Sequence, residues 1–324
     1  MPPVPESLYV AVSRQFLRAL RGERSQVAFS RRLGFTSNVA AEWESGRRIP
    51  RVTTVIHACS RSGVDIGGAL KNFWPPHAAL LADLESHSIA RWLDAQRGKE
   101  AIATVARRAT LSRHQVARIL CAETEPRLQQ FFALVHACTG RLSDLVAACV
   151  DIERIPELRS YHRRTMISRQ LAFEEPWTSA MISALECLAE VSCEQAESNL
   201  ARMFELPRED VQRYLKHLVQ ANVIARKNKR YVLSEPLLVD TGTRSQAARR
   251  LTNHWASVGA QRALAARPED VFAFNVFSVS RADFELIAQL QREHFQRVRA
   301  IVTKSDPQVV VVMNLQLMAF APEH

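Results

Sequence analysis

Side chains able to hydrogen-bond to base edges or phosphates are concentrated between residues 37 and 48. The amide of Asn38 can pair with the acceptor and the donor on the major-groove edge of adenine, and the carboxylate of Glu42 can accept from cytosine N4. Arg47 and Arg48 have the forked guanidinium group that binds phosphate oxygens in pairs. Glu42 would also repel backbone phosphates, which lowers the affinity expected for a polyanion.

Short helices must position these side chains, and the apolar spacing predicts five of them between residues 10 and 73. Thr36 is expected to cap the third helix, which Gly46 closes. The expected segments are Val10–Leu20, Gln26–Leu33 ending at Gly34, Ser37–Ser45, a fourth that starts at Pro50, and Ile66–Phe73. This order and spacing predicts a helix-turn-helix domain, because the second and third helices are joined by a short turn.

The segment LGFTSNVAAEWESGRRIP within these helices resembles the Cro and lambda-repressor type of helix-turn-helix, the xenobiotic-response-element class of bacterial and phage regulators. The resemblance covers residues 10–73 and implies DNA binding. It implies a phosphate clamp at Gln26, and it places the start of the third helix in the major groove. The DNA-binding residues that it implies are Gln26, Thr36, Ser37, Asn38, Ala41, Glu42, Arg47 and Arg48.

The charge distribution agrees with a polyanionic partner. The chain of 324 residues has a formal net charge of +10. Residues 1–70 have ten arginines and five acidic residues, which is a net charge of +5 in under a quarter of the chain. A solvated helical surface would explain the charge equally well, but these arginines flank the expected third helix.

The sequence from Arg107 to Pro126 repeats this plan, because each residue lies 76 positions after its counterpart between Arg31 and Pro50. The second copy has CAET where the first has SGRR, so the closing glycine and the basic pair are absent. Its third helix would begin with possible DNA contacts at Arg113, His114 and Gln115. We expect either a second DNA contact or a structural domain that packs against the first copy.

The segment from residue 184 to 240 is predicted to be winged-helix-like, with two helices followed by a basic hairpin. Its possible DNA contacts are Arg213, Lys216 and His217 on the longer helix and Arg226, Lys227, Lys229 and Arg230 on the hairpin. Basic hairpins can follow the minor groove or the backbone of DNA. The alternative is a dimerisation or sensor module.

The expected fold is mainly α: tandem five-helix lambda-repressor-like units, then the winged-helix-like segment and a small C-terminal α/β unit. Strands are expected at Val271–Val279 and Val309–Leu317 around a helix at Arg281–Lys304, with strand edges that could support a homodimer. Residues 174–320 also resemble an uncharacterised module found behind helix-turn-helix domains in bacterial regulators. The expected domains are 1–76, 85–150, a linker and connecting helix at 151–183, 184–240 and 241–324.

Enzyme and metal motifs are missing from the sequence. There is no nucleotide-binding glycine motif, no GxSxG and no HExxH, and the histidines and cysteines have no zinc-ligand spacing. We therefore expect no catalytic residues, no metal and no cofactor. The six cysteines include no CxxC pair, and no apolar window is long enough to span a membrane, so a cytoplasmic protein is expected.

The sequence thus predicts a sequence-specific transcriptional regulator that binds double-stranded DNA, is dimeric and inserts its third helix in the major groove. The alternative is an adaptor that retains the helix-turn-helix scaffold to bind a protein partner. A small-molecule sensor function would be compatible with the first prediction.

Overall fold

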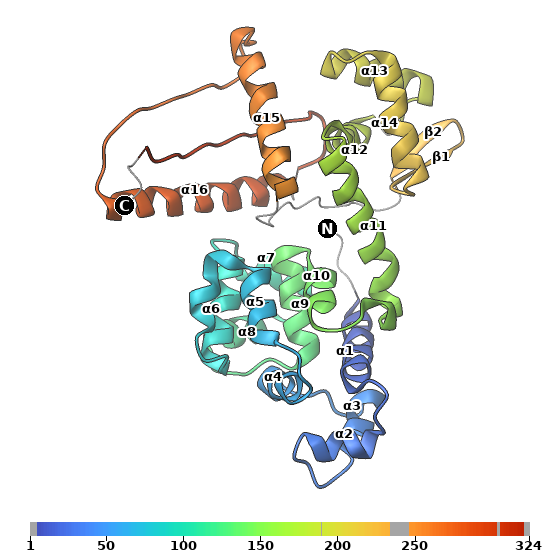
Figure 1. Ribbon diagram of the computed structural model, residues 1–324, viewed down its shortest axis with the longest axis vertical. Coiled ribbons are helices and arrows are strands. Elements are labelled where there is room, and N and C mark those ends of the chain that lie inside the picture. Colours follow the sequence, from blue (N-terminus) through green and yellow to red (C-terminus); the bar gives the residue numbers. More distant parts are fainter. Residues whose placement is uncertain (1–4, 189, 234–245, 303–304, 321–324) are drawn as a thin grey trace. The chain divides into compact units, whose positions relative to one another are not determined.

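The computed structural model describes residues 5–188, 190–233, 246–302 and 305–320 of a mainly helical chain (Figure 1). The chain divides into two compact units, Met1–His162 and Arg163–His324, and the boundary falls inside one helix. Each unit has its own hydrophobic core. The predominance of helix agrees with the 3.6-residue apolar periodicity of the sequence.

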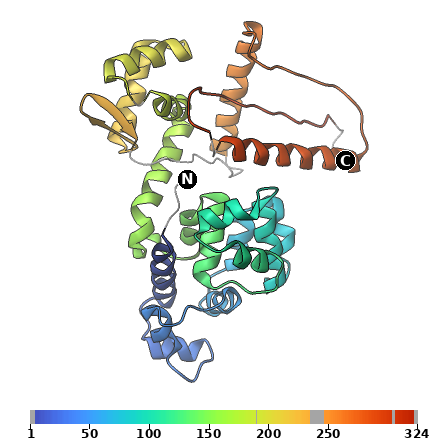
Figure 2. The same cartoon turned by 180° about the vertical axis from the view of Figure 1, so that it is seen from behind.

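The first unit consists of helices joined by short turns. They are α1 (Glu6–Arg21), α2 (Gln26–Arg32), α3 (Val39–Ser45), α4 (Val52–Arg61), α5 (Ile66–Phe73), the 3-10 helix η1 (Pro75–Leu81), α6 (Ser86–Arg97), α7 (Ile102–Ala109), α8 (Arg113–Leu120), α9 (Leu128–Thr139), α10 (Leu142–Cys149) and the 3-10 helix η2 (Ile152–Arg154). In both views α2 and α3 lie at the end of this unit that is away from α6–α8 (Figures 1 and 2). The helices α2 and α3 are therefore separated from α7 and α8 of the second copy.

One continuous core runs through both copies of the repeat. The apolar face of α1 packs on α9, where the ring of Phe16 lies edge-on to that of Phe132 with 5.6 Å between centroids. The hydroxyl of Tyr9 on the same face lies 3.0 Å from Nδ1 of His136. Burial lowers the pKa of His136 to about 4, so the imidazole is neutral at pH 7. The segments 1–76 and 85–150, expected as separate domains, thus form one compact unit.

The start of the third helix differs from the prediction. Thr36 does not cap it, because α3 begins at Val39 and Asn38 is the N-cap. Oδ1 of Asn38 accepts from Ala41 N at 3.4 Å and from Ser30 Oγ at 3.3 Å. Asn38 is favoured over Thr36 as the cap because its side chain binds both α3 and α2, whereas a Thr36 cap would bind only neighbouring backbone NH groups.

The backbone of the repeat is reproduced even where its glycines are lost. Gly34 and Thr110, which are 76 residues apart, both have positive φ angles, 89° and 55°. Gly46 and its counterpart Ala122 also do, at 80° and 60°. The hydrogen bonds around these turns repeat at the same offset; for example, Arg48 N and Thr124 N each donate at 3.2 Å to the residue six positions earlier. The two segments therefore share the same turn conformations at the 76-residue offset.

The two copies are joined at the ends of their repeated segments. Arg51 and its counterpart Arg127 form an isolated antiparallel bridge. Val52 N donates to Pro126 O and Leu128 N to Pro50 O, both at 3.0 Å. The helix expected from Pro50 consequently begins at Val52, because this pairing keeps Arg51 extended with ψ at 157°.

The second unit contains the rest of the chain. Its elements are the end of α11 (Pro156–Glu174), α12 (Trp177–Cys187), α13 (Cys193–Phe204), α14 (Arg208–Gln220), β1 (Ile224–Lys227), β2 (Arg230–Leu233), α15 (Gln246–Leu264) and α16 (Arg281–Val302). The strands pair antiparallel as a hairpin, with Lys227 opposite Arg230. The hairpin and α14 lie side by side in both views (Figures 1 and 2), and Ile224 and Tyr231 are part of the core that α12, α13 and α14 form. The two helices and hairpin expected at 184–240 are present as far as residue 233.

One prediction for the C-terminal half is wrong. The segment 151–183, expected as a linker and connecting helix, is largely helical, since α11 is continuous over 19 residues and buries Leu158 and Ala172. The expected α/β arrangement at the C-terminus is not found, because Val271–Val279 and Val309–Leu317 form no strands and the described residues from 246 onward offer no strand edge to a partner. Neither segment is paired with a neighbouring strand, and β structure is not stable without such pairing.

Candidate nucleic-acid interface

The turn between α2 and α3 is set by a glycine and two aromatic rings. Gly34 has the positive φ that ends α2, and Phe35 N donates to Ser30 O at 3.0 Å across the turn. The ring of Phe35 then packs edge-on against buried Trp43 of α3, with 5.7 Å between centroids. Glycine adopts this φ without strain, and the aromatic pair fixes the direction of the next helix.

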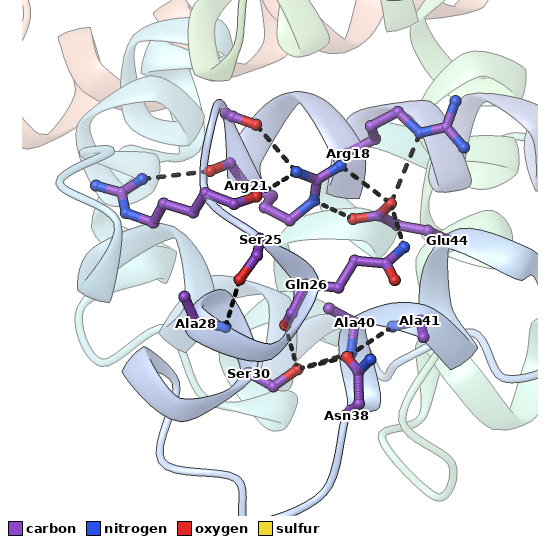
Figure 3. A network of polar contacts seen from close by, with 12 residues as sticks. Arg18, Arg21, Ser25, Gln26, Ala28, Ser30, Asn38, Ala40, Ala41 and Glu44 are labelled. Carbon is purple, nitrogen blue, oxygen red and sulfur yellow. Dashed lines mark hydrogen bonds and ion pairs between the residues drawn. The ribbon is translucent and has the colours of Figure 1, made fainter.

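Beneath the turn, the carboxylate of Glu44 joins three helices (Figure 3). Its side chain is only 3% exposed. Arg21 of α1 donates to it from Nε at 2.6 Å and from Nη2 at 3.3 Å, and Gln26 of α2 donates from Nε2 at 3.0 Å. Arg18 lies 3.7 Å away as a further cation. Since Glu44 belongs to α3, these contacts hold α3 against both preceding helices.

The charge of Glu44 is stabilised within this network. Burial by itself raises the pKa of the carboxyl, but the hydrogen bonds from Arg21 and Gln26 and the charges of Arg21 and Arg18 outweigh it, so the pKa is below its usual range. Glu44 is therefore ionised at neutral pH. Its negative charge is neutralised inside the unit and is not presented to a partner.

Two of the predicted contact residues take part in these internal bonds. Gln26, the predicted phosphate clamp, donates its amide to Glu44. Asn38 uses Oδ1 as the cap of α3, and the Ser30 hydroxyl that donates to it also accepts from Ala40 N at 3.0 Å (Figure 3). The bidentate pairing expected for Asn38 needs Oδ1 as an acceptor. In this conformation only its NH₂ group is left to donate to a base.

The other predicted residues of the first copy lie on the surface around α3. Thr36 and Ser37 are exposed in the turn that precedes the helix, and Ala41 is half-buried. Glu42 pairs weakly with Arg48 at 3.9 Å, both side chains being well exposed. Arg47 is exposed and its Nε donates to Ser45 Oγ at 3.2 Å. The Glu42–Arg48 pair offsets part of the repulsion that Glu42 would exert on a phosphate.

The second copy presents a different surface at the start of α8. Ser112 caps this helix, and Gln115 completes a capping box by accepting from Ser112 N at 3.0 Å. Gln115 is therefore bound locally, whereas Arg113 and His114 are exposed. At the position that corresponds to Glu42 the second copy has Arg118, which pairs with Glu123 at 3.5 Å. All three predicted contacts are exposed, and Gln115 is the one that takes part in the helix cap.

The predicted contacts on α14 are mostly paired with acidic residues. His217 Nδ1 lies 2.8 Å from Glu175 Oε2, and Arg213 lies 3.8 Å from the same carboxylate. Arg213 also binds Asp210 one turn earlier on the helix. Lys216 is exposed. The helix therefore has less free positive charge than its sequence indicates.

Several residues that build this region were missed by the sequence-based prediction, Glu44 above all. The signal was available, because Ala40 and Glu44 are four residues apart and so lie on one face of the helix that also includes Val39 and Trp43. A carboxylate on the buried face of a short helix predicts an internal cation. Which arginine supplies it depends on how α1 packs.

Other site classes find no support among the described residues. They contain no group of three or more His, Cys, Asp or Glu that could hold a metal ion. None of the helices that they form is long and apolar enough to cross a membrane.

Comparison with known sequences concerns the second half of the chain. Residues 159–319 match a family described as a domain of unknown function, DUF4423. This match extends from within α11 to residue 319 and does not include the α2–α3 region. No curated protein and no solved structure matches the chain.

Proposed function

We propose that the chain is a sequence-specific DNA-binding transcriptional regulator in which the start of α3 enters the major groove of double-stranded DNA. The observation that supports this most is the separation of charge around α3. Its buried acid, Glu44, is neutralised by Arg21, while exposed arginines surround the helix at positions 31, 32, 47 and 48. Outward cations around a short helix favour phosphate contacts that orient it on a duplex.

Ser37 and Asn38 would then supply the base contacts. Both are exposed at the start of α3, next to the surface arginines. Because Oδ1 of Asn38 already accepts two hydrogen bonds, we assign it a single donated bond from its NH₂ group rather than a bidentate pair. One bidentate pair discriminates between bases by about 1–3 kcal/mol, so a single bond belongs at the lower end of that range.

The test is fluorescence anisotropy of the full chain on genomic fragments selected by pull-down, at several salt concentrations. Asn38→Ser keeps a hydroxyl that can cap α3, as Ser25 and Ser112 do for α2 and α8, but removes the amide. We expect its thermal stability to stay near that of the wild type and its preference for the selected fragment to fall by about 5- to 10-fold. Asn72→Ser makes the same change at an exposed position of α5 and should leave both unchanged.

A protein-binding adaptor is the second candidate, and the internal bonds of Gln26 and Asn38 favour it, since they reduce the side chains free to contact DNA. Salt dependence separates the two. Several phosphate contacts give a steep negative slope of log affinity against log salt concentration, and a largely apolar protein interface does not. If no fragment is enriched, or if Asn38→Ser binds the selected fragment with unchanged preference, base contact by α3 is refuted.

A further inference from the structure

The hairpin of the second unit has a tip made of basic residues in an unusual conformation. Lys227 and Arg230 are its last paired residues, and the two-residue turn between them is Asn228–Lys229. Both turn residues have positive φ angles, 50° and 60°. This is the pattern of a type I′ turn, in which the second position normally favours glycine. Here that position is occupied by a lysine.

Two features of this tip oppose the stability of the hairpin. Lys229 adopts a left-handed conformation that is strained for any residue with a Cβ. Lys227 and Arg230 stand directly opposite one another, and like charges in cross-strand pairs are destabilising. Both features concentrate positive charge at one point. Residues that lower the stability of the local fold are expected at surfaces with a binding role.

The hairpin backbone is nevertheless held firmly. Lys229 O accepts a hydrogen bond from Cys193 N, at the first residue of α13, at 2.7 Å. On the inner face of the hairpin, Tyr231 donates from its hydroxyl to buried Glu197 at 3.0 Å, and Arg226 lies 3.6 Å from the same carboxylate. The cationic side chains of the tip are therefore held on a backbone that is fixed by hydrogen bonds.

The free charge of this region lies on the hairpin rather than on α14. His217 and Arg213 are bound to Glu175, and the first turn of α14 has the acidic residues Glu209 and Asp210. Residues 226–230 are all exposed, and among the described residues neither Lys227 nor Lys229 has an ion pair. Arg230 is paired with Glu190, whose side chain is almost fully exposed and which therefore contributes little.

We propose that the β1–β2 hairpin is a second DNA-binding surface, in which Lys227, Lys229 and Arg230 contact the phosphate backbone of double-stranded DNA. This inference rests on the proposed function, to which it adds a contact from the other unit. Contacts to phosphate oxygens carry no sequence information, so the hairpin supplies affinity and not specificity. Residues 226–230 include no apolar side chain, whereas protein interfaces and membrane surfaces are bound through aromatic or apolar anchors.

The experiment compares the full chain with Lys227→Gln/Lys229→Gln on a duplex of unrelated sequence and on the selected fragment. The loss of two phosphate contacts should reduce the slope of log affinity against log salt concentration by about 1.8 on both duplexes. The ratio of the two affinities should stay as in the wild type. Arg249→Gln/Arg250→Gln removes two exposed charges from α15 of the same unit and should leave the slope unchanged.

Lys229→Gly shows whether loss of affinity reflects misfolding. Glycine suits the left-handed position, so this variant should melt at the wild-type temperature or higher and still bind DNA more weakly. An unchanged salt slope in the double variant overturns the inference. An equal decrease of the salt slope in the α15 control also overturns it. Polyglutamate and phosphatidylserine vesicles serve as probes for an acidic protein and an acidic membrane. If the double variant loses binding to either probe while its binding to the duplex is unchanged, the hairpin does not contact DNA.

The failure of this inference can be distinguished from failure of the proposed function. If the wild type shows no sequence preference but its duplex binding depends on Lys227 and Lys229, the α3 proposal fails and the hairpin proposal is supported. If Asn38→Ser loses preference while the hairpin variant keeps the full salt slope, the hairpin proposal alone is refuted.

Discussion

The contact between Glu44 and Arg21 allows a quantitative prediction for Glu44→Gln. In the native chain the two carboxylate oxygens accept from Nε and Nη2 of Arg21 and from Nε2 of Gln26. Glutamine has the same size but only one oxygen, and its NH₂ group cannot accept from the guanidinium. The variant therefore leaves Arg21 with a cationic group that has lost its counter-charge.

The expected loss follows from the burial of both partners. A hydrogen bond to a charged group contributes about 1.5–3 kcal/mol, and removing one partner of a fully buried ion pair costs about 3–5 kcal/mol. The Arg21 side chain is 18% exposed and can recover part of its hydration. We therefore expect the free energy of unfolding of the first unit to fall by about 2–4 kcal/mol.

The assay is hydrogen exchange of peptides from residues 26–45 in the full chain, together with urea denaturation. The exchange protection of α3 should fall, because Glu44 joins it to α1 and α2. Glu23→Gln is the matched control, since Glu23 is 91% exposed and pairs with Arg154 at 2.9 Å on the surface, so a change below about 0.5 kcal/mol is expected. Equal effects of the two substitutions would refute the role assigned to Glu44.

The same variant should have a distinct pH dependence. Since the folded protein lowers the pKa of Glu44, the stabilisation that the carboxylate provides is complete above the unfolded pKa, about 4.3. It is lost as the pH falls through the lower folded value. Glu44→Gln lacks this titration. The difference in unfolding free energy between wild type and variant should therefore be largest near neutral pH and shrink in acid.

Three further predictions concern the repeat. Because burial lowers the pKa of His136 to about 4, its contribution to stability is complete above about pH 6.5 and is lost as the pH falls toward 4. The unfolding free energy measured by urea denaturation should therefore decline over this range by about 3 kcal/mol less in His136→Gln than in the wild type, and an equal decline in both proteins would contradict the assignment. Ala122→Gly should raise the unfolding free energy by about 1 kcal/mol in calorimetry by relieving its φ of 60°. Gly46→Ala should lower it, because alanine is strained at a φ of 80° and its Cβ would also lie 3.0 Å from Arg14 Cδ. Glu125→Ala removes the acceptor for Thr53 N at 2.9 Å and the counter-charge of Arg51 at 3.6 Å. The unfolding free energy should therefore fall by about 1–2 kcal/mol, and hydrogen exchange at the start of α4 should become faster. If exchange there stays at the wild-type rate, the backbone bridge between Arg51 and Arg127 is enough to hold the start of α4.

The sequence by itself was sufficient where short-range interactions decide the structure. The bounds of α5 match the prediction, the turn at Gly34 ends α2, and the 76-residue offset identifies the two copies. These features depend on apolar period, on backbone conformational preference and on residues close in the chain. The hairpin at β1 and β2 belongs to this group, since its partners are separated by a two-residue turn.

Tertiary structure decided every feature that depends on a distant partner. The start of α4 is set by pairing between Arg51 and Arg127, and the role of Glu44 by Arg21 on another helix. The DNA contacts predicted on α14 are reduced by Glu175, whose carboxylate lies within reach of both His217 and Arg213. The β-branched segments near the C-terminus have the composition of strands but no partner strand. A paired strand, an ion pair or a backbone bridge forms only when folding brings its partner close, and the local sequence does not specify that partner.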